Sequence, residues 1–472
     1  MGKSGINRFF RSAMLAGGLA LAVAMPRAAL ADNIVDALIG AYNTSGLLEQ
    51  NRALLRAADE DVATVVARLR PTITWVNTVT RTLADFQSSG INGSTHSTDL
   101  SAGLSLSQLL YDGGAVKITK QAAEETVLAT RQTLLSVEQQ ILFRAASAYL
   151  NMVLQSENVR LRENNVRLLG EELRAAQDRF DVGEVTRTDV ALAEAQLAEA
   201  RSYLASARGS LVTAEAEYIN AVGHKPKGLA GEPRLPKAAK SQADATSIAV
   251  RNHPSIVGAQ HQVRAAELSA QATAKALGPS ASLSFNVGVE SDLASNDFTD
   301  SASASITLSQ PLYQGGGLLA AYRSKLATRD ATRSSLLSTQ NDVIQDVADA
   351  YVRLQVAQAN LISSAEQVRA ARVAFEGIRE EAKLGARTTL DVLSAEQDLL
   401  DAQTSQISAR SEEGIASYQL LMAQGLLTAE RLGLAVQIYD PTMYFNLVKD
   451  APALTSKRSR DLDRVLKALG KQ

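Results

Sequence analysis

Residues 108–223 and 310–425 of this chain are two versions of one sequence, related by a constant offset of 202 positions without a gap. The offset joins glycines and acidic residues alike, for instance Gly183 with Gly385 and Asp189 with Asp391 (385 − 183 and 391 − 189). A long internal repeat favours an architecture built from copies of one structural unit over a single globular core. Whatever one copy folds into, we expect the chain to contain twice.

The N-terminus has the pattern of a secretory signal peptide. A basic front precedes the uncharged apolar stretch 13–25, and residues 29–31 (Ala-Leu-Ala) have the form of a cleavage site. The apolar stretch is too short to span a bilayer, so residues 1–31 are expected to be removed and the mature chain to begin at Asp32. Without the four basic residues of the leader, 44 Lys+Arg remain of 48 against 50 Asp+Glu, and the resulting negative charge argues against a nucleic-acid partner.

The sequence contains no cysteine, so an exported chain of this kind must obtain its stability from packing or oligomerisation rather than from disulfides. Beyond the leader, no apolar run reaches the roughly 18 residues that a membrane-spanning helix needs. If the chain crosses a membrane, we therefore expect it to do so with strands.

Each copy is preceded by a segment in which apolar and small polar residues alternate. The alternation predicts two strand hairpins, at about 72–108 and 280–311, with polar loops at 85–99 and 291–300. One apolar face and one Ser/Thr/Gly/Asn face are typical of a membrane barrel with a wet lumen. A half-buried hairpin on a soluble core shows the same alternation. The export signal favours the barrel.

Long helical patterns follow each hairpin. Proline-free stretches at about 114–180 and 316–383 predict rods of roughly 100 Å at about 1.5 Å per residue. Return helices are expected from near Thr186 and Thr388. In the first return helix, apolar and small residues form a heptad seam, which Gln406 and Glu413 interrupt in the second.

The remaining segments complete the expected organisation of the chain. Residues 34–70 are expected to form one helix that ends before Pro71. The first repeat would then cover about 33–223 and the second about 242–425, joined by a Pro/Gly/Lys-rich connector at about 224–241. After 425 the helical pattern dissolves, and the mixed-charge tail from Lys449 is expected to be partly ordered.

Four strands cannot close a barrel within one chain, because unpaired backbone in hydrocarbon costs several kcal/mol per group. Two chains would give eight strands and a filled interior, whereas three would give twelve strands and an open lumen. Small residues on the inner face favour three. The fold class predicted from the residues is therefore mostly α with a small β part, with duplicated long antiparallel α-hairpins and four strands contributed to a trimeric barrel.

Short motifs at equivalent places in the two copies identify a family. They are Tyr111-Asp112-Gly113-Gly114, Arg179-Phe180-Asp181-Val182-Gly183 and Thr188-Asp189-Val190 in the first copy, and Tyr313-Gln314-Gly315-Gly316, Leu384-Gly385-Ala386-Arg387-Thr388 and Asp391-Val392-Leu393 in the second. With the order of signal peptide, helix, strand hairpin and long helix, the chain resembles the TolC family of outer-membrane efflux and secretion ducts over nearly its whole mature length.

The resemblance implies a passive export duct. It implies a homotrimer with a twelve-stranded barrel in outer-membrane lipid and an α-helical barrel in the periplasm of a Gram-negative bacterium, where the segment 426–472 would also lie. It further implies a periplasmic adaptor (membrane fusion) protein and an inner-membrane RND-type pump or ABC exporter as partners. The expected role is the channel-tunnel component of a tripartite efflux pump or a type I secretion system, opened when the adaptor and pump dock.

The resemblance also assigns candidate sites at the hairpin tips. The periplasmic gate would comprise Arg387, Asp391, Thr188 and Asp189. The adaptor-docking tips would comprise Val182, Gly183, Glu184, Leu384, Gly385 and Ala386. The chain departs from the family pattern at Ser394, where a second entrance aspartate is usual, and at Ala382, where a tyrosine is usual. Fewer links in the closed state and a weaker cation site are therefore expected.

The residues themselves leave a simpler interpretation of the tips open. Thr186-x-x-Asp189 and Thr388-x-x-Asp391 have the form of capping boxes that begin the return helices. In a trimer, aspartates repeated around the mouth would also form a cation-favouring constriction. The glycine pairs Gly113-Gly114 and Gly315-Gly316 are expected at strand-to-helix joints, which need free backbone angles.

No pattern in the sequence indicates catalysis. The four histidines lack metal-ligand spacing, and Gly315-Gly316-Gly317 lacks the Gly-Lys-Ser/Thr ending of a phosphate-binding loop. We expect no catalytic residues, no metal and no cofactor. Two alternatives to the duct remain: a structural coiled-coil or adhesin-like trimeric surface protein, which leaves the apolar strand faces unexplained, and a periplasmic enzyme.

Overall fold

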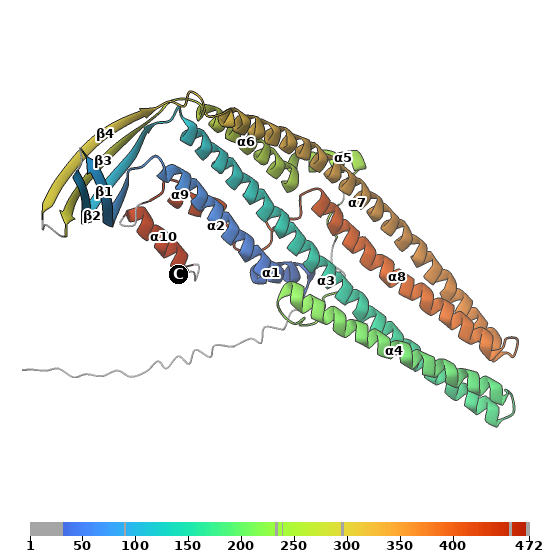
Figure 1. The fold of residues 1–472 in the computed structure, drawn as a ribbon. Helices are drawn as coiled ribbons and strands as arrows, with labels where there is room; N and C mark the ends of the chain where they lie inside the picture. Colours follow the sequence, from blue (N-terminus) through green and yellow to red (C-terminus); the bar gives the residue numbers. More distant parts are fainter. Residues whose placement is uncertain are drawn as a thin grey trace, which may run out of the picture.

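The computed structural model describes residues 32–88, 91–231, 235–237, 239–293, 297–452 and 456–468. The protomer is elongated, with a four-stranded sheet at one end and two helical hairpins at the other (Figure 1). The predicted leader lies outside the described residues. Of the helices within these ranges, none is both long and apolar enough to cross a membrane.

Two long helices run most of the length of the molecule. They are α3 (Ala115–Asp181) and α7 (Gly317–Lys383), each of 67 residues and therefore roughly 100 Å long. The return helices α4 (Arg187–Val222) and α8 (Thr389–Ala423) pack antiparallel along the ends of α3 and α7 that lie away from the sheet (Figure 1). The prediction of a mostly helical fold built on duplicated antiparallel hairpins is confirmed.

Shorter helices pack along the sheet-proximal ends of the rods. They are α1 (Ile34–Thr44) and α2 (Gly46–Ala67) before the first strand hairpin, and α5 (Gln242–Asn252) and α6 (Pro254–Lys275) before the second. The expectation of one helix over 34–70 is wrong. Ser45 adopts an extended conformation, and its hydroxyl accepts a hydrogen bond from the Leu48 amide, so a new helix begins there.

The sheet is antiparallel throughout, in the order β1 (Thr72–Ser88), β2 (Ile91–Tyr111), β3 (Ser280–Asp292) and β4 (Phe298–Ser309). Its register aligns the apolar residues of successive strands, because Trp75 lies opposite Leu104, and Leu104 lies opposite Val287. In the protomer this apolar face is bare, and Trp75 is 71% exposed. The opposite face carries small polar side chains.

The first strand hairpin is longer than the sequence pattern predicted. The expected loop at 85–99 is wrong, since β1 and β2 remain paired from Asp85 opposite Ser94 to Ser88 opposite Ile91. Polar side chains interrupt the apolar alternation there without interrupting the ladder, because pairing is made by the backbone. In the second hairpin, β3 and β4 likewise extend to Asp292 and from Phe298.

The main apolar core lies where α1, α2, α3 and α4 meet the segment after the second repeat. Leu427 and Ala429 are buried there, so this segment is part of the core although its sequence has no helical periodicity. It contains α9 (Pro441–Val448) and is followed by α10 (Lys457–Ala468). Arg70, just before β1, donates hydrogen bonds to the carbonyl oxygens of Asp450 and Ala451, which ties the tail to the root of the sheet.

Candidate functional site

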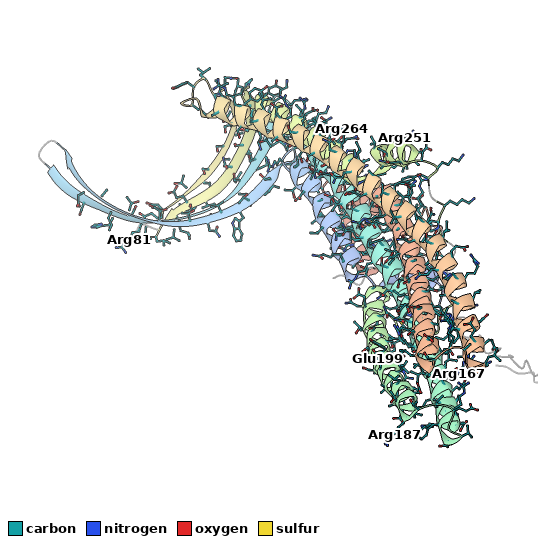
Figure 2. All side chains as sticks on the ribbon, turned by 90° about the vertical axis from the view of Figure 1, so that its right-hand side faces the viewer. Arg81, Arg167, Arg187, Glu199, Arg251 and Arg264 are labelled. Atoms are coloured by element: carbon teal, nitrogen blue, oxygen red, sulfur yellow. The ribbon has the colours of Figure 1, made fainter. Side chains whose placement is uncertain are left out.

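The two hairpin tips lie at the end of the molecule opposite the sheet, as the position of Arg187 shows (Figure 2). Each turn contains a glycine in the left-handed region, Gly183 with φ +83° and Gly385 with φ +78°. The amide of Gly183 donates to the Phe180 carbonyl, and that of Gly385 to the Ala382 carbonyl. A Cβ added at either glycine would meet no atom within 4 Å. Glycine is thus favoured by the backbone angle, not by crowding.

Both return helices begin with a complete capping box. The Thr186 hydroxyl accepts from the Asp189 amide at 3.3 Å, and the Asp189 carboxylate accepts from the Thr186 amide at 2.9 Å. Thr388 and Asp391 repeat this arrangement at 3.2 and 2.9 Å. Hydrogen bonds from the two threonines hold the pKa values of both aspartates below their ordinary range. The aspartates are therefore charged, and each already has a structural role.

Arg387 bonds within its own hairpin. Its Nε lies 2.8 Å from Oε2 of Glu381, and this bond, with a smaller contribution from Asp391, raises the pKa of the guanidinium. The protomer's hydrogen bonds do not join Arg387 to Thr188 or Asp189. Both side chains of the Arg387–Glu381 pair are about half exposed. A bond between Arg387 and the other hairpin therefore stays a prediction.

The polar links between the two hairpins lie along the helices and not in the turns at the tips. Asn165 on α3 donates from Nδ2 to Oε1 of Glu396 on α8 at 2.9 Å. Arg379 on α7 forms a salt bridge of 3.0 Å with Glu172 on α3. Leu169 and Leu393 pack beside these links. We call these six residues the joint, because they connect one hairpin to the other: Asn165, Leu169, Glu172, Arg379, Leu393 and Glu396.

Glu396 is an unusual member of the joint because only 4% of it is exposed. Its Oε2 has no hydrogen-bond partner among the described residues. Burial, with a smaller contribution from the nearby Glu172, raises the pKa of Glu396 to about 7, although Asn165 and Arg379 act in the opposite direction. A carboxyl between the hairpins thus titrates close to neutral pH.

The turns that connect strand to helix contain paired glycines with positive φ. Gly113 and Gly114 precede α3, and Gly315 and Gly316 precede α7. In the first copy, Asp112 supports the turn by accepting from the amides of Gly114 and Val116. The second copy has Gln314 at this position, and the amide of Gly317 donates to its backbone carbonyl.

Sequence reasoning named residues at the tips, whose roles stay predictions, and named none of the joint. Glu396 and its repeat partner Glu194 were visible as a conserved feature of the two copies, at positions related by the 202 offset. The available signal was a glutamate with a leucine three positions away on each side, Leu393 and Leu399, on the apolar face of a helix. The groups that the joint brings together, such as Asn165 and Arg379, carry no motif.

The described residues contain no group of acidic or histidine side chains able to hold a metal ion.

Comparison with known proteins identifies this arrangement. The family described as outer membrane efflux protein matches residues 41–224 and 245–426, which together make up most of the chain. The chain belongs to the outer membrane efflux protein family. Members of this family are trimeric outer-membrane channels that work with adaptors and inner-membrane pumps. They are transport conduits and not enzymes, which confirms that prediction.

Two relatives of this efflux protein support the assignment. It is 35% identical over 430 residues to the outer membrane efflux protein BepC of Brucella suis biovar 1 (strain 1330), covering 90% of this chain and 92% of BepC. It is 25% identical over 334 residues to the alkaline protease secretion protein AprF of Pseudomonas aeruginosa, covering 69% of each chain. The Campylobacter jejuni CmeC outer membrane channel shares its fold, with a TM-score of 0.72, 15% identity and 89% coverage of each chain.

These findings establish the role and place of the efflux protein. It is a channel-tunnel component of an efflux or secretion system. It lies in the outer membrane, with its helical part in the periplasm. The predicted TolC-family resemblance is confirmed.

Proposed function

We propose that three copies of this chain form one closed export duct, with twelve strands in the outer membrane and a helical tunnel across the periplasm. The observation that supports this proposal best is the sheet. Among the described strands, β1 pairs with β2 alone and β4 with β3 alone, which leaves two free edges and a bare apolar face. Free edges in hydrocarbon are not tolerated, and pairing β4 with β1 of the next copy would remove them.

The hairpin tips are proposed to gate the tunnel. In a trimer, three copies of Asp391 and Arg387 would surround the mouth, with Thr188 and Asp189 of the first hairpin beside them. Rings of like charge favour ions of the opposite sign. Because Ser394 supplies no second acidic ring, the expected cation selectivity depends on Asp391 and Asp189.

The turns are proposed to receive the hairpins of a periplasmic adaptor. The residues concerned are Val182, Gly183, Glu184, Leu384, Gly385 and Ala386. Val182 and Leu384 are large apolar side chains that are 71% and 86% exposed at the very ends of the hairpins. Exposed apolar groups at this position are suited to contact with another protein.

An efflux system with an RND-type pump is the proposed setting, because the relative with the higher identity and coverage is described as an efflux protein. A type I secretion system with an ABC exporter is the second candidate, favoured by the likeness to a protease secretion protein. The proposed mature chain begins at Asp32, with its repeats at about 33–223 and 242–425.

The test is pore formation by protein purified from outer membranes. We expect heat-modifiable migration on gels, a trimeric mass in detergent, and small, mostly closed conductances in planar lipid bilayers. A trimer that never conducts would instead support a structural surface protein. Deleting residues 1–31 should leave the chain in the cytoplasm.

A further inference from the structure

The joint within one chain predicts a second joint between neighbouring copies. Asn165 contacts Glu396, and the Leu150 carbonyl lies 3.5 Å from the Ser411 hydroxyl. These contacts are 15 residues apart on both helices (165 − 150 and 411 − 396), so α3 and α8 pack antiparallel in a single register. Because the chain is a repeat, α7 and α4 carry the same surfaces 202 positions away.

The corresponding surfaces on α7 and α4 are bare in the protomer. The counterparts of Leu150 and Gly414 are Val352 and Val212, which are 51% and 66% exposed. Leu150 itself is only 5% exposed, and a Cβ added at Gly414 would lie 2.9 Å from its Cδ1. Leu150 and Gly414 are in contact, but their repeat counterparts Val352 and Val212 are both largely exposed within one chain.

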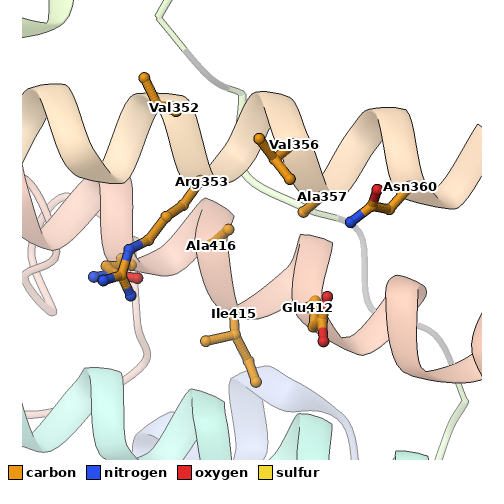
Figure 3. Close-up of a pocket in the computed structure, with 9 residues that line it drawn as sticks. Val352, Arg353, Val356, Ala357, Asn360, Glu412, Ile415 and Ala416 are labelled. Carbon is orange, nitrogen blue, oxygen red and sulfur yellow. The ribbon is translucent and has the colours of Figure 1, made fainter.

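A groove on the second hairpin marks the same place. Val352 and Val356 of α7 and Ile415 and Ala416 of α8 line a groove of about 410 Å³ (Figure 3). In the first hairpin, the equivalent positions Leu150 and Leu154 lie against residues of α8. The second hairpin needs a return helix from another chain to receive the same cover.

We propose that α4 of a second copy occupies this face, in the register that α8 adopts on α3. The proposal rests on the trimer proposed above and specifies its contacts. Val352 then packs on Gly209 and Val212 of the neighbour, as Leu150 packs on Ser411 and Gly414. Gln367 bonds to the neighbour's Glu194, as Asn165 bonds to Glu396. Glu194 and Gln367 are both exposed in the protomer, and they become a carboxyl–amide pair between copies.

The two kinds of joint differ in two respects. The leucines Leu169 and Leu393 correspond to Ala371 and Ala191 in the joint between copies. The Arg379–Glu172 bridge corresponds to the uncharged pair Gln177 and Ala374. With less apolar surface and no salt bridge, the joint between copies depends more on the pair of Glu194 with Gln367.

Cysteine cross-linking tests the register, because the natural chain has no cysteine. The variant Gly209→Cys/Val352→Cys should form covalent trimers on oxidation. A Cβ at Gly209 meets nothing within 4 Å in the protomer, so the change leaves its fold intact. The matched control Leu150→Cys/Ser411→Cys should form its disulfide within one chain and remain monomeric on a denaturing gel. The pair Gly209→Cys/Val356→Cys, displaced by about one helical turn, should cross-link far more slowly.

Trimers that cross-link best through Val356→Cys, or through none of these pairs, would overturn the register while leaving the duct intact. A chain that is monomeric before oxidation would overturn the trimer itself.

A second measurement addresses the polar pair of Glu194 and Gln367. Gln367→Glu should lower the temperature at which trimers dissociate, because it places two carboxyl groups together, and adding Glu194→Gln should restore it. No rescue by Glu194→Gln would also contradict the proposal.

Discussion

Arg379 of α7 reaches across to Glu172 of α3, with Nη2 and Oε1 3.0 Å apart, and so links the two hairpins of one protomer. Arg387, the arginine that sequence reasoning placed in a closing network, instead bonds to Glu381 of its own hairpin. In the protomer, the arginine that joins the hairpins is thus Arg379 on α7, and not Arg387 beyond the turn. This relationship determines how the gate variants should behave.

The first prediction concerns this bridge. Glu172→Gln and Arg379→Gln should each raise the conductance of the closed channel, because each removes a partly exposed ion pair. Such pairs contribute up to about 1 kcal/mol, or roughly a fivefold change in an equilibrium. After one change, the other should add little. Additive effects in planar bilayers would show that the two residues act separately.

The second prediction is a pH dependence set by Glu396. Its pKa is raised to about 7 when it is packed, mainly by burial, with Glu172, Arg379 and Asn165 as its polar neighbours. The packed joint therefore binds the proton more tightly than the separated hairpins do. Its stability is greatest below the ordinary carboxyl pKa of about 4.5 and decreases as the pH rises through about 7.

Conductance recorded from pH 5 to pH 8 checks this sign. The natural channel should open more often at the higher pH, whereas Glu396→Gln should respond little over this range. Glu366→Gln is a matched control, because Glu366 is exposed on α7 and bonds to Arg369 of the same helix. An unchanged pH profile in Glu396→Gln would remove Glu396 from the response.

The third prediction separates gating from helix capping. Arg387→Ser should raise conductance and sensitise cells to large antibiotics if Arg387 bonds across hairpins in the closed trimer. Glu381→Gln removes only the partner within the hairpin and should have a smaller effect. Equal, small effects of the two changes would restrict Arg387 to its own hairpin.

The fourth prediction concerns selectivity. Asp391→Ala should lower the preference for cations, because Ser394 supplies no replacement charge. It should also weaken the start of α8, since the Thr388 amide loses the carboxylate that accepts its hydrogen bond, whereas the bond from the Asp391 amide to the Thr388 hydroxyl remains. Asp391→Asn is the control that keeps a capping side chain without the charge. Reversal potentials in a salt gradient measure the selectivity, and an unchanged value in both variants would leave Asp391 with its capping role alone.

The fifth prediction concerns docking. Gly385→Trp should leave trimers in the outer membrane but abolish export. The turn has φ +78°, and the indole would project from the tip into the open space where the adaptor is proposed to dock. Gly385→Asn should be milder, since asparagine tolerates this backbone conformation better than other residues. Normal drug resistance in Gly385→Trp cells would exclude a docking role for this turn.

The sequence predicted those parts of the fold that depend on local periodicity. The long rods, their capping boxes and the alternating strands all have a repeating pattern of side chains that can be counted. The break at Ser45 and the extension of β1 past Asp85 were missed because backbone hydrogen bonds, not side-chain pattern, determine them. Burial of Leu427 and Ala429 depends on contacts far away in the sequence.

The candidate site divides in the same way. Thr388 and Asp391 are three residues apart, so their capping bonds follow from a local motif. Asn165 and Glu396 are 231 residues apart, and only the packing of α3 against α8 makes them neighbours. Predicting this pair requires the register of two helices, which no single segment contains.

The even number of strands in each chain has a consequence for assembly. Successive strands of the sheet alternate in direction, so β1 and β4 on its two edges run in opposite directions. When β4 of one copy meets β1 of the next, the seam has the same antiparallel geometry as every other pairing, whatever the number of copies in the ring. Strand direction alone therefore sets no limit on the number of copies, and the number three depends on the small residues of the lumen face and on the packing of the helices beneath the sheet.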